Sequence, residues 1–383
     1  HELGHFVAAR KSGMKVYEFG FGFPPRMFGI QVLKKKGGSR DSNPPKKMVF
    51  VWGTKRAENL PTPEGYETDT VYSFNWVPLG GFVRIKGEEG QETGPDSFVS
   101  QKYWKKVVVL VSGVAMNVVL AAVLLSIGHM IGLPQAVDGQ DDTLVSDRKL
   151  QIMQVMPDMP AGVAGVQPGD VVSKIDNLEK PRLKQMQDYV SENRSKEITF
   201  VITRGDENIE KKIKPKMIKD TEIGQIGVGL AEVGIVKYPW YQAFYKGIGT
   251  TWFYLKSIVI AFVMIIKGLF GGEGAGVAVS GPVGIAVMTG QVARLGISYL
   301  INFTALLSLN LAIINILPIP ALDGGRLLFI TFGRIFRKEV PLKFEQIAHA
   351  LGFLALMLLV VVITVKDIGK FKGAFIGLFD KIF

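Results

Sequence analysis

The stretch VVVLVSGVAMNVVLAAVLLSIGHMI, residues 107–131, contains no acidic residue, no lysine and no arginine. A helix needs about 20 predominantly apolar residues to cross the hydrocarbon core of a bilayer. This stretch therefore predicts a membrane-spanning helix. Two further runs predict the same, ISYLINFTALLSLNLAIINIL at 297–317 and IAHALGFLALMLLVVVITV at 347–365.

The composition agrees with a membrane protein. Hydrophobic residues make up 48% of the 383 residues, and the mean hydropathy is +0.24. The net charge of +11 comes from basic residues that cluster beside apolar runs, which membrane topology explains better than nucleic acid does. We therefore expect membrane lipid, and no nucleic acid, among the partners. The chain has no cysteine, which excludes disulfides, a thiol nucleophile and a cysteine zinc site.

A fourth apolar run, 243–270, contains Lys256 in its middle, where a charge is costly in lipid. On a helix, Lys246, Lys256 and Lys267 fall within one arc, which is typical of an amphipathic helix lying in the membrane interface. A full span with snorkelling lysines is the alternative interpretation. We expect the interfacial helix.

The chain opens with HELGH, residues 1–5, which has the pattern H-E-x-x-H. Residues i and i+4 share one face of a helix, so His1 and His5 can bind one metal ion. Zn²⁺ suits imidazole, and a catalytic zinc takes three protein ligands and a water, whose proton Glu2 could accept. The motif is short and recurs by chance, so it needs a third ligand. Because there is no initiator Met and no upstream helical turn, we expect that the chain lacks N-terminal residues.

A candidate third ligand lies in NILPIPALDGG, residues 315–325. Pro318 and Pro320 break the helix here, and irregular backbone at membrane depth is tolerated only where protein or a wet cavity covers it. A carboxylate at this depth, that of Asp323, is energetically expensive and therefore a functional candidate. Taken alone, an aspartate that ends a helix beside a Gly-Gly turn is an equally good interpretation.

Together, H-E-x-x-H near the front and N-x-x-P-x-P-x-L-D-G near the back resemble the site-2 protease family of intramembrane zinc metalloproteases. The bacterial regulator of sigma-E protease type, with a PDZ domain, looks most similar. Further similar segments are FGFGFPPRMFGI at 19–30, VPLGGFVRIKGEE at 77–89 and SGPVGI at 280–285. The resemblance implies that His1, His5 and Asp323 bind Zn²⁺, that Glu2 is the catalytic base and that Asn315 binds the substrate backbone.

The resemblance also implies a membrane-associated β-hairpin or sheet over segments 17–30 and 72–85. A strand edge in it would hold the substrate in an extended form. Gly80 and Gly81 fit either a close approach of this kind or a tight turn. With Asn315, the expected substrate-binding residues are Pro318, Pro320, Gly80 and Gly81.

The sequence departs from the family pattern in two places, which affect substrate gating and the choice of partner more than the chemistry at the metal. The second helix reads SGVAMN at 112–117, without the proline that the family usually has. Asn117 can alternatively be a polar residue that bridges two helices. The segment 31–69 is long and basic and fits the family poorly, and it could dock on anionic lipid or on a cytosolic partner.

A soluble insert follows the first long run. Residues 150–177 alternate apolar and polar side chains, strand patterns recur at 197–204 and 226–230, and 184–192 is typical of a helix. About ninety such residues make a small domain. The string PAGVAGVQPGD resembles the family's PDZ signature, which implies either peptide capture at a sheet edge or steric filtering of substrates.

The expected fold class is an α-helical membrane protein: a bundle of transmembrane helices with a membrane-associated β-hairpin or sheet, plus one inserted α+β PDZ domain. Residues 1–133 and 240–383 form the metalloprotease core, and 145–235 form the PDZ domain. Basic residues after HELGH mark the cytoplasmic side. We expect a multi-pass protein of the bacterial inner membrane, with the active site toward the cytoplasm and the PDZ domain outside, provided that 243–270 does not cross.

The resulting prediction is a zinc-dependent endopeptidase that cleaves transmembrane segments of single-span proteins, such as an anti-sigma factor or a remnant signal peptide, in regulated intramembrane proteolysis. The alternative is a catalytically inactive membrane scaffold whose PDZ domain binds peptide tails. The complete set of His1, Glu2, His5 and Asp323 argues against the scaffold. His129 and His349 lie near helix ends and are interpreted as interface residues, not as ligands.

Overall fold

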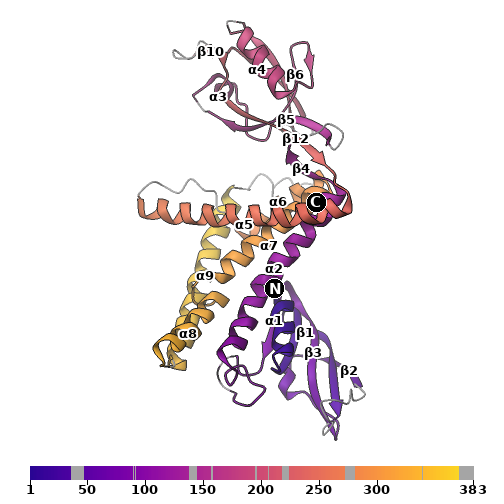
Figure 1. Ribbon diagram of the computed structural model, residues 1–383, viewed down its shortest axis with the longest axis vertical. Coiled ribbons are helices and arrows are strands. Elements are labelled where there is room, and N and C mark those ends of the chain that lie inside the picture. Colours follow the sequence, from indigo (N-terminus) through magenta and orange to yellow (C-terminus); the bar gives the residue numbers. More distant parts are fainter. Residues whose placement is uncertain are drawn as a thin grey trace. The chain divides into compact units, whose positions relative to one another are not determined.

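The computed structural model describes residues 1–35, 47–88, 90, 92–137, 145–156, 158–194, 196–205, 207–217, 224–271, 281–338 and 340–370 (Figure 1). The chain forms two compact units. The first unit comprises His1–Ala122, Thr251–Gln291 and Thr304–Phe383, and the second comprises Val123–Thr250 and Val292–Phe303.

Among the described residues, four helices are long and apolar enough to cross a membrane: α2 (Tyr103–Ile131), α5 (Trp240–Gly271), α7 (Ile297–Ile316) and α9 (Leu342–Lys370). Helices α2, α7 and α9 confirm that the three predicted runs are helical. The most apolar windows of α2 and α9 are 28% and 0% buried, so their outward faces suit lipid better than water. Helix α5 confirms a helix at 243–270, but its length also suits a span, so its interfacial placement stays a prediction.

The short helix α1 (Glu2–Lys11) carries the two histidines of HELGH and packs closely on α2. Gly4 permits this approach, because a Cβ at this position would stand 2.2 Å from the carbonyl oxygen of Ser112. The adjoining apolar core combines buried residues of α1, of α2 and of the segments around the sheet: Ala8, Ala9, Met14, Val16, Ile85, Phe98, Val109 and Leu110. This core holds the histidine-bearing helix against α2.

A three-stranded antiparallel sheet follows α1, with the order β2-β1-β3. Its strands are β1 (Val16–Lys35), β2 (Lys47–Trp52) and β3 (Tyr66–Ile85), which confirm the predicted β structure at 17–30 and 72–85. One face covers a small core with the 3₁₀ turn η1 (Ala57–Asn59). On the other, the Phe28 ring stacks on those of Phe50 and Phe74. Among the described strands, residues 81–85 of β3 pair on one side only, with residues 16–21 of β1, so the other edge of this part of β3 is open.

Two shorter helices flank α7 in the chain. Helix α6 (Pro282–Leu295) precedes α7, and α8 (Asp323–Phe336) follows it after a turn. Asp367 of α9 is buried and accepts hydrogen bonds from the amides of Gly281 and Gly284, at 2.8 and 2.7 Å. Its carboxylate therefore satisfies amides at the N-terminus of α6.

The second unit contains an antiparallel sheet with the order β4-β12-β5-β6-β8-β9. These strands are β4 (Leu133–Ala136), β5 (Val145–Val155), β6 (Val171–Ile175), β8 (Ile198–Arg204), β9 (Glu207–Ile213) and β12 (Val228–Val236), and β7 (Leu178–Glu179) pairs with β6. Strands β10 (Lys216–Met217) and β11 (Gly224–Gln225) form a separate pair, and the helices are α3 (Pro160–Val163) and α4 (Leu183–Glu192). The predicted strands at 197–204 and 226–230 and the helix at 184–192 are confirmed as β8, β12 and α4.

The core of this sheet lies under α4. Its fully buried residues include Ile175, Met186, Ile198, Phe200 and Ile202. Strand β12 pairs with β5 from Val228 to Val236, but with β4 only from Val233 onward. Among the described strands, the first half of β12 therefore has one open edge, and it lies close to α4. The boundaries 1–133, 145–235 and 240–383 stay predictions.

Candidate metal centre

The histidines of HELGH come together because α1 places them one turn apart. His1 is the N-cap residue of α1, and His5 is buried in its second turn. The two rings meet edge to face, with centroids 4.7 Å apart and planes at 85°. Their Nε2 atoms are 3.2 Å apart, so both nitrogens point to one place. The i and i+4 spacing read from the sequence therefore has the consequence expected of it.

Asp323 reaches the same place from the other end of the chain. Helix α7 ends at Ile316 and α8 begins at Asp323 after a six-residue turn. A Cβ at Gly324 would stand 2.2 Å from the carbonyl oxygens of Ile316 and Leu317, and one at Gly325 would stand 2.3 Å from that of Ile319. Only glycine fits at these positions, so the Gly-Gly pair is what lets the turn close and present Asp323.

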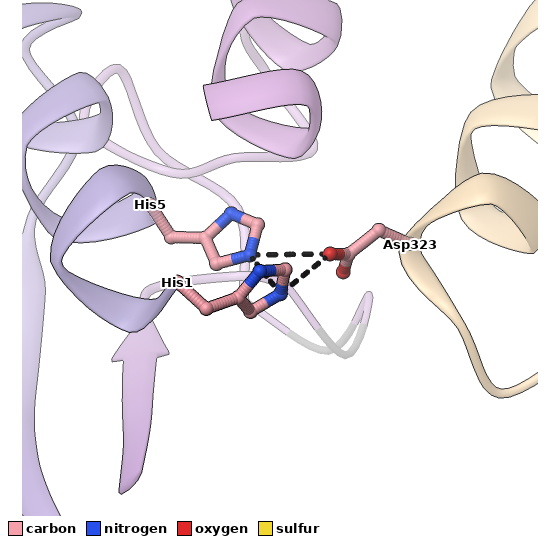
Figure 2. Close-up of side chains that lie close together, drawn as sticks. All are labelled: His1, His5 and Asp323. Atoms are coloured by element: carbon pink, nitrogen blue, oxygen red, sulfur yellow. Dashed lines mark hydrogen bonds and ion pairs between the residues drawn. The ribbon is translucent and has the colours of Figure 1, made fainter. Parts of the chain in front are cut away.

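The three side chains converge. The Oδ2 atom of Asp323 lies 3.0 Å from His1 Nε2 and 3.3 Å from His5 Nε2. Figure 2 shows the two imidazoles on one side and the carboxylate reaching toward them from the other. Among the described residues, these three are the group of metal-binding side chains close enough to share an ion.

The residues fit a zinc ion. A tetrahedral ion with bonds of 2.0–2.1 Å holds its ligand atoms about 3.3 Å apart. The three distances between the donor atoms, 3.0, 3.2 and 3.3 Å, are close to this value. Asp323 Oδ2 is buried and accepts no conventional hydrogen bond from the described residues. Three lone pairs that face one another in this way suit a cation, and two imidazoles with a carboxylate leave a fourth position open.

Helix α2 supports the histidines from behind. The Nδ1 atom of His5 is 2.8 Å from the carbonyl oxygen of Val109, which fixes a proton on Nδ1 and leaves the lone pair on Nε2. At Gly113 a Cβ would stand 2.3 Å from His5 Nε2 and 2.9 Å from His1 Cε1. Neither residue was singled out from the sequence. Val109 and Gly113 are four residues apart in an apolar helix, and this spacing could have predicted that one face of the helix is turned toward the histidines.

The other predicted residues lie at different distances from the centre. Asn315, in the last turn of α7, has its Nδ2 atom 3.3 Å from His1 Nε2. Glu2 starts α1, and its Cγ atom lies 3.6 Å from where a Cβ of Gly81 would stand. The structure thus brings Asn315 to the histidines and Gly81 to Glu2.

Gly80, Pro318 and Pro320 have other contacts. Gly80 has a positive φ of 70°, and its Cα faces the Phe23 ring. Both prolines lie in the turn between α7 and α8, and Pro320 packs closely on Gly352 of α9. They shape the surroundings of the centre, whereas Asn315 contacts it directly.

The two remaining histidines have other partners. His129 Nε2 lies 3.0 Å from Thr250 Oγ1, within the second unit. His349 Nδ1 accepts a hydrogen bond of 2.8 Å from the amide of Ala321, a residue with a φ of 80° in the turn that ends at Asp323. His349 therefore braces the turn that presents Asp323, a role that its place near a helix end did not reveal.

Comparison with known proteins shows the family of the chain. Residues 63–359 match the sequence profile of Peptidase family M50. The chain is 30% identical to the "Putative zinc metalloprotease CPE1693" of Clostridium perfringens, over 96% of this chain and 94% of that one. It is also 30% identical to the "Zinc metalloprotease RasP" of Oceanobacillus iheyensis (97% and 95%) and 29% identical to the "Regulator of sigma-W protease RasP" of Bacillus subtilis (97% and 95%).

Among solved structures, the PDZ domain of an SdrC-like protein from Listeria innocua is 22% identical, over 21% of this chain and 92% of that one. Its TM-score of 0.20 is too low to carry a fold assignment. The family match extends over most of the chain, and the metalloprotease relatives cover nearly all of it. The chain therefore belongs to peptidase family M50, the site-2 protease family, and is a metalloendopeptidase.

Proposed function

We propose that the protein cleaves peptide bonds within the transmembrane segments of single-span membrane proteins, with Zn²⁺ held by His1, His5 and Asp323. The observation that carries the proposal is the convergence of the three donor atoms within 3.3 Å, beside long apolar helices. When bound, the ion supplies Lewis-acid chemistry: it polarises the scissile carbonyl and activates water.

Glu2 is the proton carrier of the reaction. It lies on α1 next to His1, and its side chain approaches Gly81 of β3. Its carboxylate takes a proton from the attacking water and delivers it to the leaving amine. Asp323 does not serve as the base, because its carboxylate is engaged with the two histidines.

The substrate binds as an extended strand. A helix hides its amides in its own hydrogen bonds, so the segment has to unwind before it is cut. The open edge of β3 at Gly81 offers backbone groups to such a strand, next to Glu2. The Asn315 side chain, which contacts His1, holds the strand from the α7 side.

The inserted domain acts on substrates before they reach the centre. It is of the PDZ type, and the first half of β12 beside α4 offers an open edge for an extended peptide. A purely steric filter is the alternative for this domain. The protein lies in a bacterial inner membrane with its centre toward the cytoplasm and the inserted domain outside, and its substrates are anti-sigma factors or remnant signal peptides.

Replacing Glu2 tests the proposal directly. Glu2→Gln keeps the shape of the side chain but cannot accept the proton, so cleavage of a model transmembrane substrate falls by about 10²–10⁴-fold. Bound zinc, measured on the same purified protein by elemental analysis, stays at one ion per chain. Glu64→Gln, an exposed residue in the turn before β3, serves as the control and behaves as wild type. Full cleavage by Glu2→Gln, or a wild-type protein that binds no zinc, would contradict the proposal.

A further inference from the structure

One face of α2 touches both histidines. Val109, Gly113 and Asn117 are four residues apart and so lie on the same side of the helix. Val109 contacts the His5 ring through its carbonyl oxygen, and Gly113 lies against both rings. Asn117 continues the row: its Nδ2 atom is 3.4 Å from His1 Nδ1. Each histidine thus has a partner on α2 for the ring nitrogen that faces away from Asp323.

The proton of His1 has to be on Nδ1 when the ring binds a metal. Nε2 is the nitrogen that points at Asp323 and His5, so Nε2 keeps its lone pair. A neutral imidazole then carries its hydrogen on Nδ1, which needs an acceptor. For His5 this acceptor is a backbone carbonyl. For His1 the side chain within reach is the amide of Asn117.

An amide side chain can serve this need. Its oxygen and nitrogen exchange places by a half turn about the last bond, and the hydrogen-bond network decides which one faces a partner. With a hydrogen on His1 Nδ1, the stable orientation of Asn117 presents Oδ1 as the acceptor. The residue is well placed to hold this position, because it is 4% exposed and its own carbonyl accepts a 2.9 Å hydrogen bond from Ser308 Oγ.

We propose that Asn117 is a positioning residue of the zinc centre: its Oδ1 accepts the Nδ1 hydrogen of His1 and so fixes the ring with Nε2 toward the metal. The inference rests on the proposed zinc site. Partners of this kind orient ligand histidines and raise their basicity, and their loss costs about 10–100-fold in metal affinity. His1 depends on a side chain for this contact, whereas His5 depends on the backbone, so His1 is the ligand that a substitution can release.

Three variants of the whole protein test the proposal. Asn117→Leu removes the acceptor at similar volume, Asn117→Asp keeps an acceptor and removes the donor, and Asn310→Leu is the control. Asn310 is a half-buried asparagine of α7 whose side-chain amide donates a 2.9 Å hydrogen bond to the Leu306 carbonyl of its own helix. Zinc affinity is measured by competition with a chromophoric chelator, and the unfolding temperature of each metal-free protein is measured alongside.

We expect zinc affinity to fall about 10–100-fold in Asn117→Leu, and to stay within a few-fold of wild type in Asn117→Asp and Asn310→Leu. Wild-type affinity in Asn117→Leu would overturn the inference. So would an Asn117→Asp protein that folds like wild type without metal but binds zinc as weakly as Asn117→Leu, because Asn117 would then act as a donor. If Asn117→Leu does not fold, the Asn117→Asp result decides alone. Failure of the wild-type protein to bind zinc would instead refute the proposed function.

Discussion

Gly113 lies so close to His5 that a methyl group on its Cα would stand 2.3 Å from the Nε2 atom that faces Asp323. Two helices can approach this closely only where a residue has no side chain. Gly113→Ala should push both imidazoles out of place and lower cleavage by about 100-fold, since a shift of about 1 Å is enough for that loss. Zinc affinity should fall as well. Turnover of a model substrate and zinc competition check this.

Gly249→Ala is the matched control for Gly113→Ala. Gly249 also lies inside a long helix, α5, but a Cβ there meets nothing within 4 Å. The control should cleave and bind zinc like wild type. Equal activity of the two variants would show that the space at Gly113 does not matter.

Asp323 is half-buried and Asp367 is buried, both in the first unit, but of the two only Asp323 faces the histidines. Asp323→Ala should abolish zinc binding and leave the fold intact, since its Oδ2 has no hydrogen-bond donor to lose. Asp367→Ala should retain zinc and lower stability by roughly 1–3 kcal/mol, because two buried amides lose their acceptor. Elemental analysis and thermal unfolding separate the two outcomes. Zinc retained at one ion per chain in Asp323→Ala would exclude it as a ligand.

Arg326 of α8 forms an ion pair with Glu88, which follows β3. The pair ties the helix that begins with Asp323 to the strand that carries Gly81, and both residues line two adjoining clefts of about 300 and 810 Å³. Arg326→Glu and Glu88→Arg should each reduce cleavage, and the double exchange should recover part of it. The expected coupling is about 0.5–3 kcal/mol, and measured turnover in the double-mutant cycle gives it. Additive losses without recovery would mean that the pair does not position α8.

Asp170 in the second unit is a pH-dependent stabilising group. Burial alone opposes its charge, but hydrogen bonds from Arg204 and from the Gln167 amide outweigh burial and hold the pKa of this carboxyl below its usual range. A carboxyl with a lowered pKa in the folded state stabilises the fold above the pKa of the unfolded chain, about 3.9, and loses this contribution as the pH falls through the folded-state value. The domain should therefore lose stability in acid.

Asp170→Asn checks this dependence. At pH 7, amide hydrogen exchange in β6 and β8 of the intact protein should be roughly tenfold faster than in wild type, the size expected for a charge-assisted hydrogen bond. The difference should begin to shrink below about pH 4, where this carboxyl becomes protonated in the unfolded chain, and should disappear as the pH falls through the lowered pKa of the folded state. A difference that is independent of pH would assign the effect to packing and not to charge. Asp188→Asn, an exposed residue of α4, is the control.

Helix α5 decides the sidedness of the centre. If it lies in the interface, α7 ends on the side where α1 ends, and Asp323 can meet the histidines. Because the chain has no cysteine, Lys246→Cys and Lys267→Cys each give a single labelling site. An impermeant thiol reagent should label both from the same side of the membrane. Labelling from opposite sides would show that α5 crosses.

Local patterns predicted the elements well. Three features of the sequence depend only on residues near one another in the chain. The length of the charge-free run at 107–131 predicts a spanning helix, and the H-E-x-x-H spacing predicts two histidines on one face of α1. The glycine pair after Asp323 predicts a tight turn. The four residues of the proposed zinc site, His1, Glu2, His5 and Asp323, could therefore be named from the sequence. The segment 31–69 was harder, because its strands pair with partners whose register depends on the whole sheet.

The sequence by itself determined that long apolar helices form, that His1 and His5 share a helix face and that a tight turn precedes Asp323. Only the tertiary structure decided that these pieces meet, and that Val109, Gly113 and Asn117 of α2 and His349 of α9 support them. The physical reason is the distance along the chain over which each interaction acts. Hydrophobic length and helical repeat act between neighbours in the chain, whereas the contact of His1 with Asp323 joins residues over three hundred positions apart, which only the packing of whole helices can bring together.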